Sequence, residues 1–182
     1  MSPKFVHLHL HSEYSLVDGL VRIPELISHC TQNGTAAIAL TDQSNVFGSS
    51  KFFRSAMSAG IKPIIGADLW VVDSENTGKP YKIVFLCQNN LGYKNLSILL
   101  TRAYREGQHR GIPMVHENWL TISQLTGIIC LSGGISGDIG LAFLTGSKET
   151  MLRSAAKWQA LIGERYYLEV FRTGRLQEEA YL

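Results

Sequence analysis

The feature of the sequence that most constrains its fold is the alternation of short apolar runs with longer segments of helical periodicity. Ala37–Thr41 and Gly127–Leu131 have the length of buried strands, whereas Leu91–Arg105 has the spacing and length of a helix. Strands that alternate with helices favour a mostly parallel sheet or a barrel. The sequence therefore predicts an α/β fold.

The same patterns give the expected order of elements along the chain. The expected strands are Phe5–His11, Ala37–Thr41, part of Lys62–Val72, Lys82–Cys87, Gly127–Leu131 and Tyr166–Phe171. The expected helices are Pro24–Gln32, Phe47–Ser58, Leu91–Arg105, Glu117–Leu125 and Met151–Ile162. Residues 106–116 are predicted to form a polar loop. The last residues have the pattern of a helix opening, so we expect the chain to be part of a longer domain.

Composition excludes several classes of protein. A hydrophobic content of 45% and a charged content of 18% are ordinary for a globular domain and argue against disorder. A net charge of +2 gives no support for a broad duplex-binding surface. No apolar run approaches the roughly 18 residues that a membrane-spanning helix needs. We therefore expect a cytoplasmic protein with no membrane partner, and reduced, buried thiols at Cys30, Cys87 and Cys130.

Three alternating histidines are the sharpest chemical feature. His7, His9 and His11 would project to one face of a strand, and two imidazoles at that spacing can share one metal ion. The alternative is a half-exposed strand with polar residues on its solvated face. The two interpretations have similar weight on the sequence alone.

Other polar residues lie near the predicted strand ends, where α/β folds carry their chemistry. Asp18, Asp42 and Asp68 are candidate carboxylate ligands, although a structural role is favoured for each alone, with Asp18 in a turn and Asp42 in a strand-end cap or turn. The glycine-rich segment 132–140 lacks the phosphate-binding P-loop pattern. The remaining histidines are interpreted as surface or cap residues: His29, His109 and His116. The tryptophans are interpreted as core or interface residues: Trp70, Trp119 and Trp158.

Six sequence blocks in order resemble one known family. They are FVHLHLHSEYSLVDG, AIALTDQSNVFG, GIKPIIGADLWV, NNLGYKNLSILLTRAY, GIICLSGGISGDIG and YYLEVFRTGR. They are similar to the PHP (polymerase and histidinol phosphatase) domain that opens the alpha subunit of bacterial DNA polymerase III. The resemblance covers essentially the whole chain, so residues 1–182 are expected to be the N-terminal part of such a domain.

The resemblance implies a distorted barrel of (β/α)7 type, incomplete here because the chain stops at Leu182. Active members bind up to three metal ions and hydrolyse phosphoesters. By resemblance, the ligands kept in this chain are His9, His11, Asp18 and Asp68. Four positions depart from the active pattern: Gln43 replaces a histidine, Asp68 a glutamate, Lys82 a histidine and Gly134 a cysteine.

These departures predict a degenerate site. A neutral amide, a cation and a missing side chain are poor substitutes for anionic or imidazole ligands. We expect no tightly bound metal, with residual Zn²⁺ or Mn²⁺ binding left open, and an ammonium of Lys82 paired with Asp68 or Asp42. The expected role is a structural module that docks a proofreading exonuclease subunit and other replicase subunits. The parent polymerase would use Mg²⁺ and contact DNA.

Two alternatives remain open at this stage. The first is a working metal-dependent phosphoesterase or exonuclease. The second is a module that contacts DNA directly.

Overall fold

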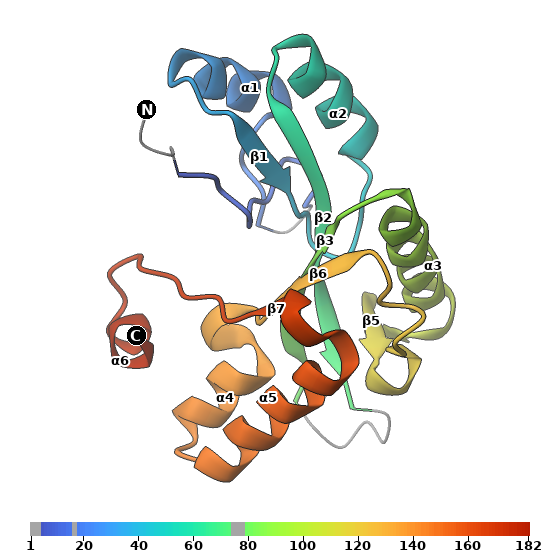
Figure 1. The fold of residues 1–182 in the computed structure, drawn as a ribbon, viewed down its shortest axis with the longest axis vertical. Helices are drawn as coiled ribbons and strands as arrows, with labels where there is room; N and C mark the ends of the chain where they lie inside the picture. The colour runs from blue at the N-terminus through green and yellow to red at the C-terminus, as the bar shows by residue number, and fades with distance from the viewer. Residues whose placement is uncertain (1–4, 16–17, 74–78) are drawn as a thin grey trace. The chain divides into compact units, whose positions relative to one another are not determined.

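The computed structural model describes residues 5–15, 18–73 and 79–182, which form two compact units (Figure 1). The first unit ends at Asp68 and the second begins at Leu69. Both contain helices and strands, so the α/β prediction is confirmed.

The first unit is built on two parallel strands and two helices. β1 (Ala37–Leu40) pairs with the beginning of β2 (Lys62–Val72), with Ala37 opposite Lys62. α1 (Ile23–Gln32) begins with a proline in its first turn, and α2 (Ser49–Ser58) follows β1. Their apolar faces form one core with the strands: Ile23, Leu26, Ile27, Cys30, Ile38, Leu40, Phe52, Ala56 and Ile61.

The strand predicted for residues 5–11 is wrong. The segment forms backbone hydrogen bonds to β1, but Ala39 N–H donates to His7 O and Thr41 N–H donates to Leu10 O. The two acceptors, His7 and Leu10, are three residues apart, whereas the two donors in and after β1, Ala39 and Thr41, are two residues apart. This mismatch breaks the regular ladder of hydrogen bonds. Leu10 N–H donates instead to Thr41 Oγ1 at 2.8 Å.

The second unit contains a mixed sheet. The end of β2 pairs in parallel with β5 (Ile112–His116), and β3 (Tyr81–Cys87) pairs antiparallel with β6 (Ile128–Leu131). β7 (Tyr166–Tyr167) adds in parallel to β6. The strand order is β4-β5-β2-β3-β6-β7, open at β4 and β7 in the described part of the chain, which fits an incomplete barrel. Its long helices are α3 (Asn90–Glu106) and α5 (Lys148–Ile162).

The loop predicted for residues 106–116 is wrong, because it contains a β-hairpin. β4 (Gln108–His109) pairs with the start of β5, with His109 opposite Ile112. The two residues between them, Arg110 and Gly111, have φ values of +52° and +81°. Two positive φ angles are the signature of the tight turn that suits a two-residue hairpin. Arg-Gly is a weak sequence signal for it.

Three further boundaries differ from expectation. Residues 117–125 form only a short 3₁₀ helix, η1 (Glu117–Trp119), followed by turns. β7 stops at Tyr167 because β6 has ended, and Glu169 N–H donates to the Ser132 side chain instead. Within the glycine cluster lie η2 (Gly134–Ser136) and the unpredicted helix α4 (Asp138–Leu144). The expected final helix is confirmed as α6 (Leu176–Tyr181).

A partly buried polar cluster joins the helices of the second unit to its sheet. Lys157 Nζ lies 2.9 Å from Glu117 Oε1 and 3.2 Å from Asp138 Oδ2. Trp158, which is fully buried, donates its indole N–H to Asp138 at 2.9 Å. Burial raises the pKa of Tyr81, whose hydroxyl donates to Glu117. Trp158 is therefore a core residue, as predicted.

The three cysteines lie wholly or partly inside the fold. All three cysteines are free; Cys30 and Cys130 are buried and Cys87 is partly buried. Burial raises the pKa of Cys87 to about 12, so its thiol stays protonated and unreactive. None of the helices in the described ranges is long and apolar enough to cross a bilayer.

Candidate functional site

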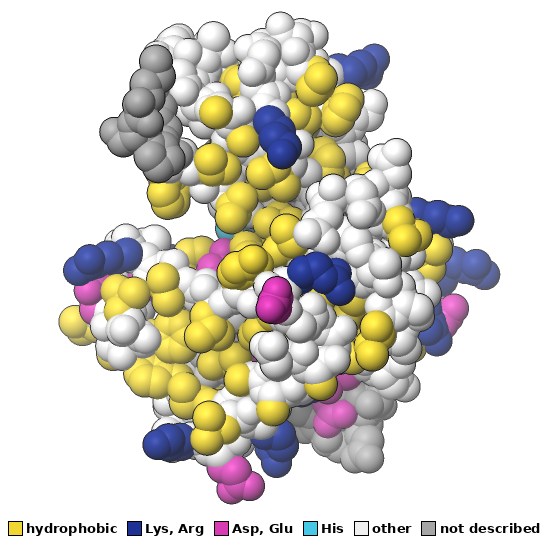
Figure 2. Space-filling model, viewed as in Figure 1, with side chains coloured by type: hydrophobic (Ala, Val, Ile, Leu, Met, Phe, Trp, Pro, Cys, Tyr) yellow, Lys and Arg dark blue, Asp and Glu magenta, His cyan; other side chains and the backbone are white. Residues whose placement is uncertain are grey.

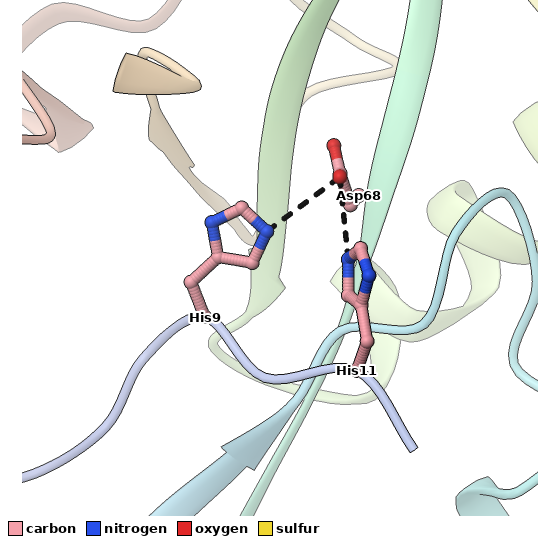
Figure 3. A group of neighbouring side chains, drawn as sticks. All are labelled: His9, His11 and Asp68. Carbon is pink, nitrogen blue, oxygen red and sulfur yellow. Dashed lines mark ion pairs between the residues drawn. The ribbon is translucent and has the colours of Figure 1, made fainter. Parts of the chain in front are cut away.

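Two histidines and one aspartate of the first unit converge on one point (Figure 3). We call His9, His11 and Asp68 the His–Asp group. His9 Nε2 lies 3.5 Å and His11 Nε2 lies 3.3 Å from the same oxygen, Oδ2 of Asp68. The two rings are 5.3 Å apart, centroid to centroid. One ligand atom from each residue lies within 4.8 Å of the others.

Local structure explains this convergence. Asp68 lies in β2, and its side chain is completely buried. His9 and His11 belong to the segment that is hydrogen-bonded to β1, and their side chains are only 16% and 15% exposed. His7 does not belong to the group, and its ring packs against that of Phe5 with 4.8 Å between the ring centroids. The structure thus brings together two of the three alternating histidines, although the segment is not a regular strand.

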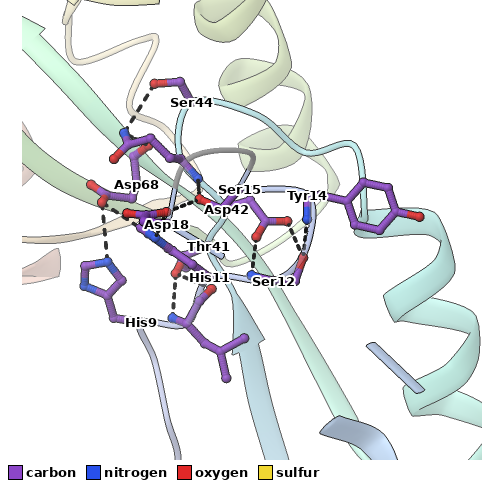
Figure 4. A network of polar contacts seen from close by, with 12 residues as sticks. His9, His11, Ser12, Tyr14, Ser15, Asp18, Thr41, Asp42, Ser44 and Asp68 are labelled. Atoms are coloured by element: carbon purple, nitrogen blue, oxygen red, sulfur yellow. Dashed lines mark hydrogen bonds and ion pairs between the residues drawn. The ribbon is translucent and has the colours of Figure 1, made fainter. Parts of the chain in front are cut away.

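A second layer of hydrogen bonds orients the turn after His11 (Figure 4). Ser12 donates to Asp42 twice, from its backbone N–H at 2.6 Å and from its hydroxyl at 3.0 Å. Ser15 Oγ accepts from the backbone N–H of Gln43 at 3.0 Å and donates to Asp18 Oδ1 at 2.8 Å. The residues that follow β1 therefore fix both ends of the turn.

Asp42 is the buried carboxylate that accepts two of the hydrogen bonds in this layer. It is 1% exposed, and burial raises the pKa of its carboxyl, while the hydrogen bonds from Ser12 oppose that rise. The sequence singled out Asp42 because it follows a strand, but it lies outside the His–Asp group. Its role in the structure is to accept hydrogen bonds.

Asp18 contacts one member of the His–Asp group, His11. Its Oδ1 is 2.9 Å from His11 Nδ1, on the side of the ring away from the atom that faces Asp68. The Asp18 side chain is 47% exposed. The expected direct role of Asp18 as a ligand stays a prediction.

The residues at three of the positions that the resemblance predicts to be altered make contacts of their own in the structure. Gln43 Nε2 donates to the backbone carbonyl of Asp68 at 2.9 Å, which ties its amide to β2. Gly134 has φ +57°, and a Cβ there would lie 2.4 Å from the ring of Phe171. Lys82 Nζ lies 5.1 Å from the centroid of the Trp70 ring. The ion pair expected between Lys82 and Asp68 or Asp42 stays a prediction.

The spacing of each histidine from Asp68 in the His–Asp group fits one divalent cation. Ligand atoms about 2.0–2.2 Å from a Zn²⁺ ion lie roughly 3–4 Å from one another. The two separations from Asp68 Oδ2, 3.5 Å and 3.3 Å, match that spacing. His11 Nε2 is buried and has no hydrogen-bond partner among the described residues, as expected of a ligand atom. A cation there would supply Lewis-acid chemistry.

Sequence reasoning missed the serines of the turn. Ser12 and Ser15 are both fully buried and connect the histidines to the end of β1. Their position between His11 and Asp18 was the only available signal. The remaining histidines lie elsewhere: His29 is exposed on α1, His109 is exposed in β4 and His116 ends β5.

Comparisons with known proteins agree with these features. The profile of the PHP domain family matches residues 7–173. DNA polymerase III subunit alpha of Vibrio cholerae serotype O1 is 42% identical over 180 residues, and that of Escherichia coli K12 is 39% identical over 180 residues. Both alignments cover 99% of this chain but only 15% of the relative.

Among solved structures, an amidohydrolase from Chromobacterium violaceum matches with a TM-score of 0.43 and 25% identity. The match covers 54% of this chain and 32% of that chain.

Proposed function

Because the chain belongs to the PHP domain family, we propose that it is the N-terminal part of the PHP domain of a replicative DNA polymerase III alpha subunit. The parent protein would carry out DNA-templated synthesis in the cytoplasm with Mg²⁺. Residues 1–182 would form a structural module on which the proofreading exonuclease subunit and other replicase subunits dock. The support is the identity of about 40% to such subunits along the whole chain.

One observation carries the proposal that this module is not a hydrolase. Only His9, His11 and Asp68 form a group of three metal-binding side chains in the described ranges. Two or three metal ions held side by side need more ligands than these three. We propose that this group is a remnant that binds one Zn²⁺ or Mn²⁺ ion weakly, next to Asp18.

The alternatives receive less support. A working phosphoesterase would need a ligand at position 43, where the Gln43 amide is committed to the backbone of β2. A DNA-contacting module would favour a gathered basic surface. On the face shown in Figure 2, Lys and Arg side chains are scattered and do not form one broad patch, and the net charge is only +2.

We expect the untagged 182-residue chain to contain well under one tightly bound metal ion per molecule. It should also hydrolyse no phosphodiester when Mn²⁺ or Zn²⁺ is added, because three ligands cannot assemble a multi-metal centre. Elemental analysis and a nuclease assay on single-stranded DNA measure both. Two or three stoichiometric metal ions with nuclease activity would overturn the proposal in favour of a working hydrolase.

The proposed docking role is tested by complex formation with the exonuclease subunit. The chain should co-elute with the proofreading exonuclease subunit of the same organism in size-exclusion chromatography. Binding should survive a chelator, because the proposed dock does not depend on metal. Absence of any complex at micromolar concentrations would contradict the docking role without affecting the metal prediction.

A further inference from the structure

Side chains from α3, η1 and β5 form a stack on the surface of the second unit. The guanidinium of Arg102, in α3, lies 4.1 Å from the centroid of the Trp119 ring, in η1. The ring of His116, at the end of β5, has its centroid 4.6 Å from that of Trp119. We call Arg102, Trp119 and His116 the arginine–tryptophan stack. Because contact with an aromatic ring restrains a guanidinium, Arg102 loses less rotamer freedom when it binds a ligand.

The guanidinium of Arg102 keeps donors for such a ligand. Its Nε donates to Glu106 Oε2 at 2.8 Å, and this is its only hydrogen bond within residues 5–15, 18–73 and 79–182. A guanidinium carries five N–H donors, so four remain on the two Nη atoms. The Arg102 side chain is 44% exposed, which lets a ligand reach them. The planar pair of Nη groups fits the two oxygens of a carboxylate.

The charge around the stack also favours an anion. The end of α3 and the hairpin that follows it contain three arginines and one acidic residue, all of them exposed: Arg102, Arg105, Arg110 and Glu106. Their net charge of +2 equals that of the whole chain. Glu117, the next acidic residue along the chain, is paired with Lys157 at 2.9 Å. The surface beside Arg102 is therefore locally basic.

An open strand edge lies next to these arginines. β4 is the first strand of the sheet order, and its residues Gln108 and His109 are exposed. Met114 N–H donates to Gly107 O at 3.0 Å and Gly107 N–H donates to Ala103 O at 3.0 Å, which holds the hairpin against the end of α3. An extended peptide can add to an exposed sheet edge through its backbone hydrogen bonds.

A peptide fits these features better than a nucleic acid. The backbone groups of a strand edge pair with another peptide backbone, which a nucleic acid lacks. Stacking of bases needs an accessible aromatic face, whereas the Trp119 ring already contacts Arg102 and His116. The basic surface is also small, with three arginines, and does not form the long groove that follows a nucleic acid backbone.

We propose that the arginine–tryptophan stack and the edge of β4 bind an acidic, extended peptide segment of a protein partner. A carboxylate of the peptide is held by the Nη groups of Arg102, and its backbone pairs with β4. The proposal rests on the docking role described above and adds the chemistry that the partner presents to this surface.

The test uses the full 182-residue chain and a fluorescein-labelled decapeptide of alternating glutamate and valine. Fluorescence anisotropy should show binding, and the Trp119 indole N–H signal should shift in NMR spectra. Arg102→Ala should weaken binding about 10–100-fold, as expected for loss of charge-assisted hydrogen bonds. Arg102→Lys keeps the charge but not the planar pair of donors, so its affinity should lie between the two.

Arg153→Ala is the matched control. Arg153 is also an exposed arginine on a helix of the second unit, so its loss changes the net charge equally. This variant should bind the peptide like the wild type. Equal weakening by Arg102→Ala and Arg153→Ala would show attraction by net charge alone and overturn the proposal.

Two further results would contradict the surface. One is a wild-type chain that does not bind the acidic peptide, and the other is tighter binding of a single-stranded oligothymidylate that is lost in Arg102→Ala. The exonuclease subunit provides a separate comparison. Peptide binding without co-elution of that subunit would contradict the docking role and support the surface, whereas co-elution without peptide binding would do the reverse.

Discussion

Gly134→Ala is expected to lower the free energy of unfolding by about 2–4 kcal/mol, from backbone strain and overpacking together. Gly134 has φ +57°, a conformation that side chains with a Cβ rarely adopt. An added Cβ would also lie 2.4 Å and 2.5 Å from two carbons of the Phe171 ring. Urea denaturation of the variant and the wild type measures the loss.

A substitution at a second glycine, Gly146, separates the effect of backbone strain from that of overpacking. Gly146 has φ +71° and nothing within 4 Å of an added Cβ, so Gly146→Ala carries the backbone strain alone. We expect it to lose about 1–2 kcal/mol. In Gly134→Ala combined with Phe171→Ala, the losses should be less than additive, because the clash is gone. Equal losses at positions 134 and 146 would show that Phe171 does not restrict the site.

The contact between Gly134 and Phe171 also concerns the prediction that position 134 once held a metal ligand. By resemblance, active PHP domains carry a cysteine at the position of Gly134, and any such side chain would have to displace Phe171. Restoring the cysteine alone should therefore destabilise the chain rather than rebuild a metal centre.

The sequence predicted the parts of the fold that rest on strong periodicity. α1, α2, α3 and α5 bury regular apolar faces, and their positions were found within a few residues. The β4–β5 hairpin was missed because its turn depends on two positive φ angles at Arg110 and Gly111, which an Arg-Gly pair hardly signals. The helix α4 was missed because neighbouring glycines suggested turns only.

The candidate site, like the fold, was predicted in part. The alternation of His9 and His11 correctly suggested that both side chains point one way, although the strand assumed for them is broken by the Thr41 side chain. Asp68 was a candidate because it lies in a predicted strand, but so were Asp18 and Asp42, and only the resemblance set it apart from Asp42. The parts played by Ser12 and Ser15 depend on tertiary hydrogen bonds between the turn and the end of β1, which no local pattern encodes.

Replacing Asp42 is the second substitution from which we expect a large loss in the free energy of unfolding. Asp42→Ala is expected to cost about 2–4 kcal/mol, because it leaves the backbone N–H and the hydroxyl of buried Ser12 without their acceptor. The turn that carries His11 would lose its attachment to the end of β1. Urea denaturation should show the loss, and His11 should lose its fixed ring orientation in NMR spectra.

Asp42→Asn is the matched control, and its pH dependence tests the electrostatics. Asparagine can accept from the Ser12 N–H while its amide donates to the Ser12 hydroxyl, so the loss at neutral pH should stay below about 1 kcal/mol. Burial raises the folded-state pKa of Asp42 above its ordinary value of 3.8. The stabilisation from this titration is therefore fully present below about pH 3.8 and is lost as the pH rises through the folded-state pKa. Relative to Asp42→Asn, the wild type should gain stability on acidification, and a constant difference between about pH 3 and pH 8 would contradict a raised pKa.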